Sequence, residues 1–158
     1  MGTVIQQFMD KFEEFKTLPS GESFTIEVTD LEATAAAREY VAENKAQIRE
    51  AMKQETGFEL DVDKPSIAFR NDAVLLSLMA GVGFLKTKAS ITADVKWDGK
   101  PVVVVRSVEV PVISVSPGEL NGMVEEPLKQ MTEAVEEYAE IRSFKLTDGL
   151  AVLEAVRK

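Results

Sequence analysis

Paired carboxylates are the residues in this chain whose types and spacing could do chemistry. The pairs are Glu13/Glu14, Asp61/Asp63, Glu125/Glu126 and Glu136/Glu137. Two carboxylates that converge in a cleft could serve a glycosidase as acid and base, or could bind a divalent cation. Most of these acids fall on the outward faces of expected helices, and Asp61-Val62-Asp63 lacks the further oxygen ligands of a calcium loop. We therefore interpret them as surface charge and expect no catalytic site and no metal site.

Histidine and cysteine are both absent from the 158 residues. Without them the chain cannot build a Ser-His-Asp or Cys-His nucleophile, a Cys/His zinc site or a disulfide scaffold. The glycines of Gly81-Val82-Gly83 and Ser116-Pro117-Gly118-Glu119 lack the spacing and the following lysine of a phosphate loop. We therefore predict a protein that is not an enzyme and uses no cofactor.

Charge and hydrophobicity restrict the partners further. The chain has 18 Lys+Arg against 27 Asp+Glu, a formal charge of -9, and 45% hydrophobic residues. A chain of this length is about one domain and can bury a core, which argues against intrinsic disorder. An acidic chain is a poor ligand for phosphate backbones, so we expect no nucleic-acid partner.

Two charged segments each allow two interpretations. Lys86, Lys88, Lys96 and Lys100 gather around Trp97, a combination that suits contact with lipid headgroups at a membrane surface. Lysines that protect an edge strand explain the same pattern. The segment 116–140 carries seven Glu and one Lys, which is typical of a solvated helix face or of an acidic surface that docks a basic partner.

The first third of the sequence reads as helix, strand, helix. Residues 3–18 place apolar side chains at helical spacing, and 22–29 alternate strictly as in a half-buried strand. A helix over 31–54 follows, capped by Thr29 or Asp30 and ended by Gly57. Its expected inner face consists of Ala33, Ala37, Tyr40, Val41, Ile48 and Met52.

From 58 to 115 the apolar period becomes two, which predicts about four antiparallel strands. Asn71-Asp72 and Asp98-Gly99 are turn signals. Lys64-Pro65 interrupts the first strand, and bends or bulges are expected at Gly81/Gly83 and at Arg106-Ser107. Residues 88–97 show the clearest alternation, with Ala89, Ile91, Ala93, Val95 and Trp97 on one side.

A helix over 116–139 and a hairpin over 141–147 and 150–157, turning at Asp148-Gly149, complete the chain. The expected fold class is α+β in the order α-β-α-β-β-β-β-α-β-β. Bent strands should curl, so we expect a curved antiparallel sheet wrapped around a long helix. Residues 1–21 form an N-terminal amphipathic helix and linker, and 22–158 form a single α+β domain.

This ordering resembles small bacterial tubular lipid-binding (TULIP-type) domains. The segments that carry the resemblance are SFTIEVTDLEA, PSIAFRNDAVLLS, KASITADVKWDGKPVVVVRSVEVPVISVSPGELNGMV and EIRSFKLTDGLAVLE, within residues 22–158. The pattern looks most like the YpmS-like proteins and, more loosely, the LmeA-like ones. Membership would imply an elongated apolar groove between helix and curved sheet that binds lipid or another acyl chain without catalysis.

The groove expected from this reading is lined by Phe24, Ile26, Leu76, Leu78, Leu120, Val124, Leu128 and Met131. The alternative function is a protein-interaction or structural module with a solid core and an acidic docking helix. The aromatic side chains Phe8, Phe12 and Phe15 of residues 3–18 need cover, from the protein's own sheet, from a homodimer partner or from a membrane. The resemblance implies an extracytoplasmic, membrane-tethered protein if an N-terminal anchor was removed; otherwise a cytoplasmic one is expected.

Overall fold

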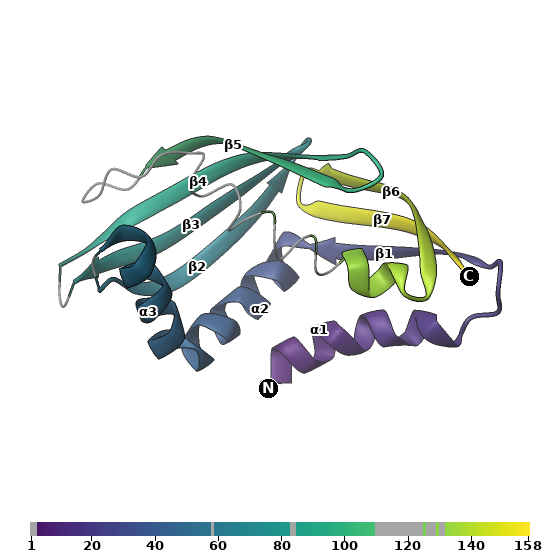
Figure 1. Ribbon diagram of the computed structural model, residues 1–158, viewed down its shortest axis with the longest axis horizontal. Helices are drawn as coiled ribbons and strands as arrows, with labels where there is room; N and C mark the ends of the chain where they lie inside the picture. Colours follow the sequence, from purple (N-terminus) through teal and green to yellow (C-terminus); the bar gives the residue numbers. More distant parts are fainter. Residues whose placement is uncertain (1–2, 58, 83–84, 110–124, 126–128, 130–131) are drawn as a thin grey trace.

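Strands with alternating apolar residues build two antiparallel β-sheets in this protein (Figure 1). The structure is a computed structural model that describes residues 3–57, 59–82, 85–109, 125, 129 and 132–158. The α+β class expected from the sequence is confirmed. The elements are α1 (Thr3–Glu13), the 3-10 helix η1 (Glu14–Thr17), β1 (Ser23–Thr29), α2 (Asp30–Glu43), α3 (Lys45–Thr56), β2 (Asp61–Arg70), β3 (Ala73–Val82), β4 (Leu85–Trp97), β5 (Pro101–Glu109), β6 (Ala139–Thr147) and β7 (Leu150–Arg157).

The strands divide into a three-stranded sheet, β1-β7-β6, and a four-stranded sheet, β2-β3-β4-β5. The first strand of the chain pairs with the last, from Ser23 opposite Val156 to Thr29 opposite Leu150. From the sequence we expected one sheet. The difference arises because β1 joins the C-terminal hairpin, a pairing between segments more than 120 residues apart that no local pattern reports.

The helix expected over 31–54 is divided in two at Asn44. Its backbone N–H and its side-chain Nδ2 both donate to the carbonyl oxygen of Tyr40, at 3.0 and 2.9 Å. An Asn side chain that bonds to the preceding turn competes with helical bonding, so α2 ends at Glu43. The expected caps are confirmed: Thr29 begins α2 with a capping box, and Gly57 ends α3 at φ 81°. Tyr40, expected on the inner face, is 53% exposed.

Most turns and two bulges of the sheets lie where the sequence placed them, but the bulge expected at Gly81 is absent: β3 pairs with β4 without a register shift, up to Val82 opposite Leu85. Gly99 and Gly149 adopt φ of 70° and 79° in their hairpin turns, and Asp72 adopts 58° in the β2–β3 turn. The β2–β3 register shifts between Asp63 and Ser66, at the predicted Lys64-Pro65 interruption. The β4–β5 register shifts so that Arg106 has no partner in β4, which confirms the bulge predicted there.

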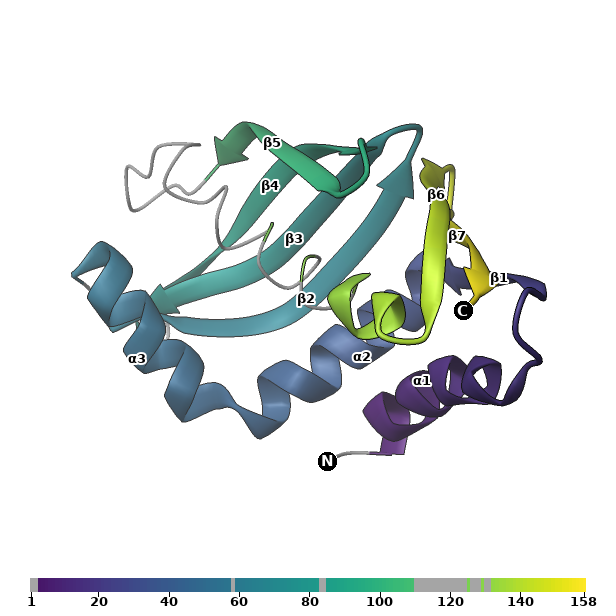
Figure 2. The same cartoon turned by 45° about the vertical axis from the view of Figure 1, so that its right-hand side comes forward.

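The core lies where the inner faces of the two sheets meet (Figure 2). Phe24, Ile26 and Leu153 come from the three-stranded sheet, and Val95 and Val103 come from the four-stranded sheet. Val135 of the helical residues 132–136 and Tyr138 join the same cluster. Leu146 is the largest side chain that is fully buried among the described residues, at 1% exposure.

Helix α2 lies along the edge of β2 rather than on a sheet face, and it bonds directly to that strand (Figure 1). The Thr34 hydroxyl accepts from the N–H of Ile67 at 2.9 Å and donates to its carbonyl oxygen at 3.0 Å. Arg38 Nε donates to Pro65 O at 3.1 Å. These side chains satisfy backbone groups that an edge strand would otherwise leave open to another chain.

Candidate functional site

The four-stranded sheet has an apolar inner face and a mixed outer face. Paired residues in the ladder share a face, so the register assigns each side chain. The inner face, which turns toward the core, carries Val62, Ile67, Phe69, Val74, Leu76, Leu78, Ala80, Thr87, Ala89, Ile91, Ala93, Val95, Trp97, Pro101, Val103, Val105 and Val108. The outer face mixes serines, threonines and charged residues, including Ser66, Ser77 and Ser90 on one rung, with the apolar side chains of Leu75, Met79, Val102 and Val104. No described inner-face residue of this sheet is ionisable.

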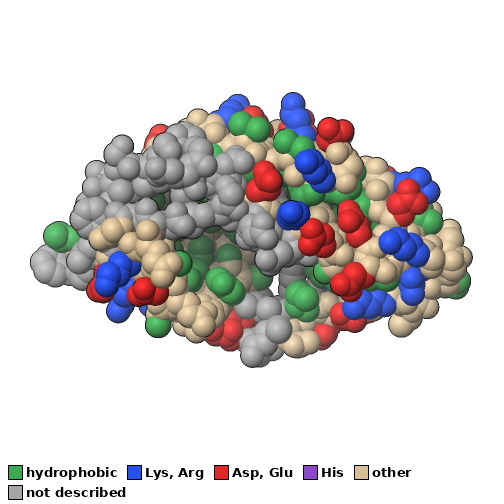
Figure 3. All heavy atoms as spheres, viewed as in Figure 1, with side chains coloured by type: hydrophobic (Ala, Val, Ile, Leu, Met, Phe, Trp, Pro, Cys, Tyr) green, Lys and Arg blue, Asp and Glu red, His purple; other side chains and the backbone are tan. Residues whose placement is uncertain are grey.

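The inner face is not buried evenly along its strands. At the end near the β2–β3 and β4–β5 turns, Phe69, Val95 and Val103 are buried in the core. In the middle of β3, Leu76 and Leu78 are only half-buried although β3 is a central strand, whereas Ala80 and Ala89 on the same face are buried, at 8% and 5% exposure. We call the segment that contains Leu76 and Leu78 the open half of the inner face. Figure 3 shows hydrophobic side chains exposed in a recess beside the charged side chains over α3.

The residues that the sequence proposed for a groove fall into three groups. Leu76 and Leu78 lie together on the open half of the inner face. Phe24 and Ile26 lie in the three-stranded sheet, with 8% and 2% exposure, inside the packed core. The other four, Leu120, Val124, Leu128 and Met131, lie outside the described residues.

Pairing between strands adds residues that the sequence did not propose for this face. Ile91 of β4 lies opposite Leu76, and Val108 of β5 lies opposite Ile91, so the three side chains form one rung. Alternation in residues 88–97 placed Ile91 on an apolar face. The sequence signal therefore existed, but only the register joins that face to β3.

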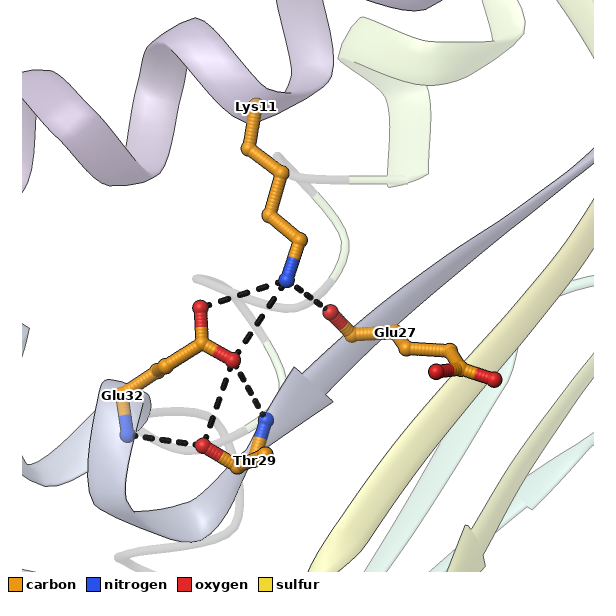
Figure 4. Close-up of polar contacts among 4 residues, drawn as sticks. All are labelled: Lys11, Glu27, Thr29 and Glu32. Carbon is orange, nitrogen blue, oxygen red and sulfur yellow. Dashed lines mark hydrogen bonds and ion pairs between the residues drawn. The ribbon is translucent and has the colours of Figure 1, made fainter.

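Helix α1 flanks this interior and is attached by a polar cluster at the start of α2 (Figure 4). Glu32 accepts from the N–H and the hydroxyl of Thr29, each at 3.2 Å, and from Lys11 Nζ at 3.2 Å. Lys11 also donates to the carbonyl oxygen of Glu27 in β1. Burial raises the pKa of Glu32, but the bonds from Thr29 and Lys11 outweigh it and hold the pKa below its usual value.

Aromatic rings and Arg157 hold the other end of this N-terminal segment. Phe15 stacks on Phe24 with 4.8 Å between ring centroids, and Phe24 in turn stacks on Tyr138 at 6.3 Å. The Tyr138 hydroxyl donates to Phe12 O at 3.3 Å, and burial raises the pKa of that phenol. Arg157 donates to Lys16 O through Nε and Nη2 at 3.2 and 3.1 Å. Phe12 and Phe15 thus contact the protein's own core; the side chain of Phe8 lies outside the described part.

The predicted headgroup contact is divided between the two faces of β4. Trp97 is half-buried on the inner face and packs against the core, whereas Lys86, Lys88 and Lys96 belong to the outer face. Lys100 lies beyond the strand, in the β4–β5 turn.

The acids of β2 are held in ion pairs. Asp63 pairs with Lys86 and with Lys45 at 3.0 Å, and these two hydrogen bonds hold the pKa of Asp63 below its usual value. Asp61 accepts from Arg49 Nε at 2.8 Å. In the part of the chain that the structure describes, no group of three or more acidic side chains is arranged to hold a metal ion.

Comparison of the chain with protein-family models, with curated proteins and with solved structures finds no match. None of the helices in the described ranges is both long enough and apolar enough to cross a membrane. The candidate site therefore depends on the geometry of the inner face alone.

Proposed function

We propose that this protein binds an elongated apolar ligand, a lipid or another acyl chain, on the open half of the inner face, without catalysis. The observation that carries the proposal is the incomplete burial of Leu76 and Leu78 on a continuous apolar face. Full burial of an exposed apolar side chain contributes about 1.5–3 kcal/mol, and these half-buried side chains contribute a part of that, so an acyl chain lying across several of them would gain favourable burial.

The absence of ionisable side chains from the described inner face supports an uncharged bound segment. A charged group buried there would lack a partner and would be costly. Aliphatic residues, here Leu76, Leu78, Ile91 and Val108, adapt to a flexible chain and offer no directional bonds. Binding should therefore depend on the shape and hydrophobicity of the ligand, with little selectivity among acyl chains of similar length.

The finer fold belongs to this proposal as well. The resemblance to tubular lipid-binding domains implies a curved sheet wrapped around a long helix over residues 22–158. Support comes from the apolar inner face of four consecutive strands and from Val135 and Tyr138, which share its core cluster. The helix expected over 31–54 is divided at Asn44, and α2 follows the edge of β2. Helix α2 is therefore not the long helix around which this proposal wraps the sheet.

The first experiment is native mass spectrometry of the purified protein, followed by extraction with organic solvent and identification of the extracted material. A co-purifying mass in the lipid range that is lost on denaturation supports the proposal. If the purified protein carries no ligand and also fails to take up dodecanoate or dodecanol, the result contradicts the proposed lipid binding. It then favours the alternative, a protein-interaction module.

A matched pair of variants tests the location. Leu78 and Met79 are neighbours in β3 but lie on opposite faces, both half-buried. Leu78→Trp should fill the open half and abolish uptake of dodecanol, whereas Met79→Trp should leave uptake unchanged. Equal uptake by two folded variants would exclude this face as the binding site.

A further inference from the structure

We propose that the ligand is an anionic amphiphile of the fatty-acid class, and that Arg38 and Lys64 bind its carboxylate at the β2 edge of the inner face. This inference rests on the proposed function, because it assigns a headgroup site to the same apolar surface. It goes further because it adds selectivity for charge to a surface that hydrophobicity alone would leave without it.

Four half-buried side chains form a line across the whole four-stranded sheet, here called the half-buried rung. Ile67 of β2 lies opposite Leu76 of β3. Ile91 of β4 lies between Leu76 and Val108 of β5. Adjacent strands are about 4.8 Å apart, so the rung is about 14 Å long. An extended chain advances about 3.5 Å for every three single bonds, so an acyl chain of about twelve carbons matches this length.

The β2 end of the rung carries two cations that have no ion pair. Arg38 of α2 donates through Nε to the carbonyl oxygen of Pro65 at 3.1 Å, which holds its guanidinium beside β2. In the described ranges no acidic side chain pairs with Arg38 or Lys64. By contrast, Lys45 and Arg49 of the neighbouring α3 already pair with acids of β2. A guanidinium can bind a carboxylate through two parallel hydrogen bonds, so Arg38 suits a carboxylate headgroup.

A bulge places Lys64 at the candidate site. The β2–β3 register shifts so that Lys64 and Pro65 together lie opposite Leu78 of the open half. Lys64 is exposed and has φ 48°, in the left-handed region that residues other than glycine rarely adopt. Bulges are common beside functional sites, where they redirect a side chain. A cation is thus held next to Leu78 at some cost in backbone energy.

The β5 end of the rung disfavours an anion. Val108 is followed by the exposed side chain of Glu109, and Arg106 nearby is already paired with Asp94. The chain as a whole has a formal charge of -9, so its overall field repels anions. Among the described residues at the two ends of the rung, a carboxylate therefore meets unpaired positive charge at the β2 end alone.

The experiment compares three ligands that share one tail: dodecanoate, dodecanol and dodecyltrimethylammonium. Each is kept below the concentration at which it aggregates, and its affinity is measured at neutral pH by displacement of the neutral fluorescent probe N-phenyl-1-naphthylamine. The wild-type protein should bind dodecanoate about fivefold more tightly than dodecanol, the size of a favourable exposed ion pair. It should bind the cation more weakly than the alcohol, although the net charge of the chain attracts cations.

Variants locate the headgroup. Arg38→Gln should abolish the preference for dodecanoate over dodecanol. Lys64→Asn should reduce it to about twofold, and asparagine tolerates the positive φ at this position. The matched control is Lys145→Gln, at an exposed lysine of β6, which changes the net charge by the same amount and should keep the full preference. Each readout is a ratio of two affinities on one protein, so a general loss of stability affects both ligands alike.

The outcomes separate the two proposals. Equal binding of dodecanoate and dodecanol by the wild-type protein, or tightest binding of the cation, overturns the headgroup site and leaves the proposed function intact. A preference that survives in folded Arg38→Gln also overturns it, and so does an equal loss in Lys145→Gln, because net charge then explains the effect. If Arg38→Gln does not fold, a preference unchanged both by Lys64→Asn and by high salt overturns the site. A wild-type protein that takes up neither the probe nor any of the three ligands overturns the proposed function and the headgroup site together.

Discussion

The Thr34 hydroxyl should be one of the most important polar groups in the fold. It forms two hydrogen bonds with the backbone of Ile67 and so holds α2 against the open edge of β2. Thr34→Val removes both bonds while it keeps the shape of the side chain. Threonine and valine have similar helix propensities, so the change tests the hydroxyl and little else.

The expected loss follows from the two bonds. A neutral intramolecular hydrogen bond contributes a net 0.5–1.5 kcal/mol on average, so roughly 1–3 kcal/mol is lost when two are removed. Thr34 is half-buried and water replaces part of the loss, which places the expectation near 2 kcal/mol. For a chain of this size that corresponds to a melting temperature about 6 °C lower.

Urea unfolding at 25 °C provides the assay. With a slope of about 2 kcal/mol per molar, the midpoint should fall by about 1 M while the slope stays unchanged. The same substitution at Thr25, which is exposed on the outer face of β1, is the control and should change stability by less than about 0.5 kcal/mol. If Thr34→Val and Thr25→Val have the same midpoint, the hydroxyl does not hold α2, and the reasoning fails.

Three other predictions concern the core, a turn and pH. Leu146→Ala should cost about 3 kcal/mol because Leu146 is fully buried, whereas Leu85→Ala, at a side chain 68% exposed, should cost under about 0.5 kcal/mol in urea titrations. Gly81→Ala should cost about 1–3 kcal/mol in the same assay, because a Cβ there would overlap the carbonyl oxygen of Leu85. Glu32→Gln should cost under about 1 kcal/mol at pH 7 in thermal melts, because Lys11 loses its partner. The folded pKa of Glu32 is lowered, so its contribution is present above about pH 4.5 and disappears as the pH falls through the folded value.

Each of these predictions has a contradicting result. Equal losses for Leu146→Ala and Leu85→Ala would mean that the core has been wrongly assigned. A Gly81→Ala protein with wild-type stability would show that the backbone at Leu85 shifts without cost to make room for the added Cβ. A Glu32→Gln deficit that does not shrink at all as the pH falls below about 4.5 would assign the effect to packing rather than to the carboxylate charge.

Local signals in the sequence were sufficient for the elements and their ends. Alternation found β1 and β4 because a strand with one buried face repeats every two residues. Asp98-Gly99 and Asp148-Gly149 marked hairpins because glycine tolerates the positive φ that those turns require. Thr29 marked the start of α2 because its hydroxyl can bond to the first turn.

The candidate site was accessible from the sequence only in part. Leu76 and Leu78 lie on one strand, where alternation alone groups them on one face. Phe24 and Ile26 were grouped with them because all four are apolar positions in strands, yet the structure assigns them to a different sheet and to the packed core. An apolar pattern predicts that a side chain is buried, but it does not predict which part of the protein covers that side chain.

Tertiary structure decided the remaining features, because each depends on segments distant in the chain. The pairing of β1 with β7, the position of α2 along β2 and the stacking of Phe24 on Tyr138 all join residues that are far apart in the sequence, and no local pattern identifies their partners. The sequence by itself determined periodicity, turns and caps, which act within a few residues. The division into two sheets, and with it the incompletely buried inner face, is set by long-range packing, where backbone pairing and apolar burial are satisfied together.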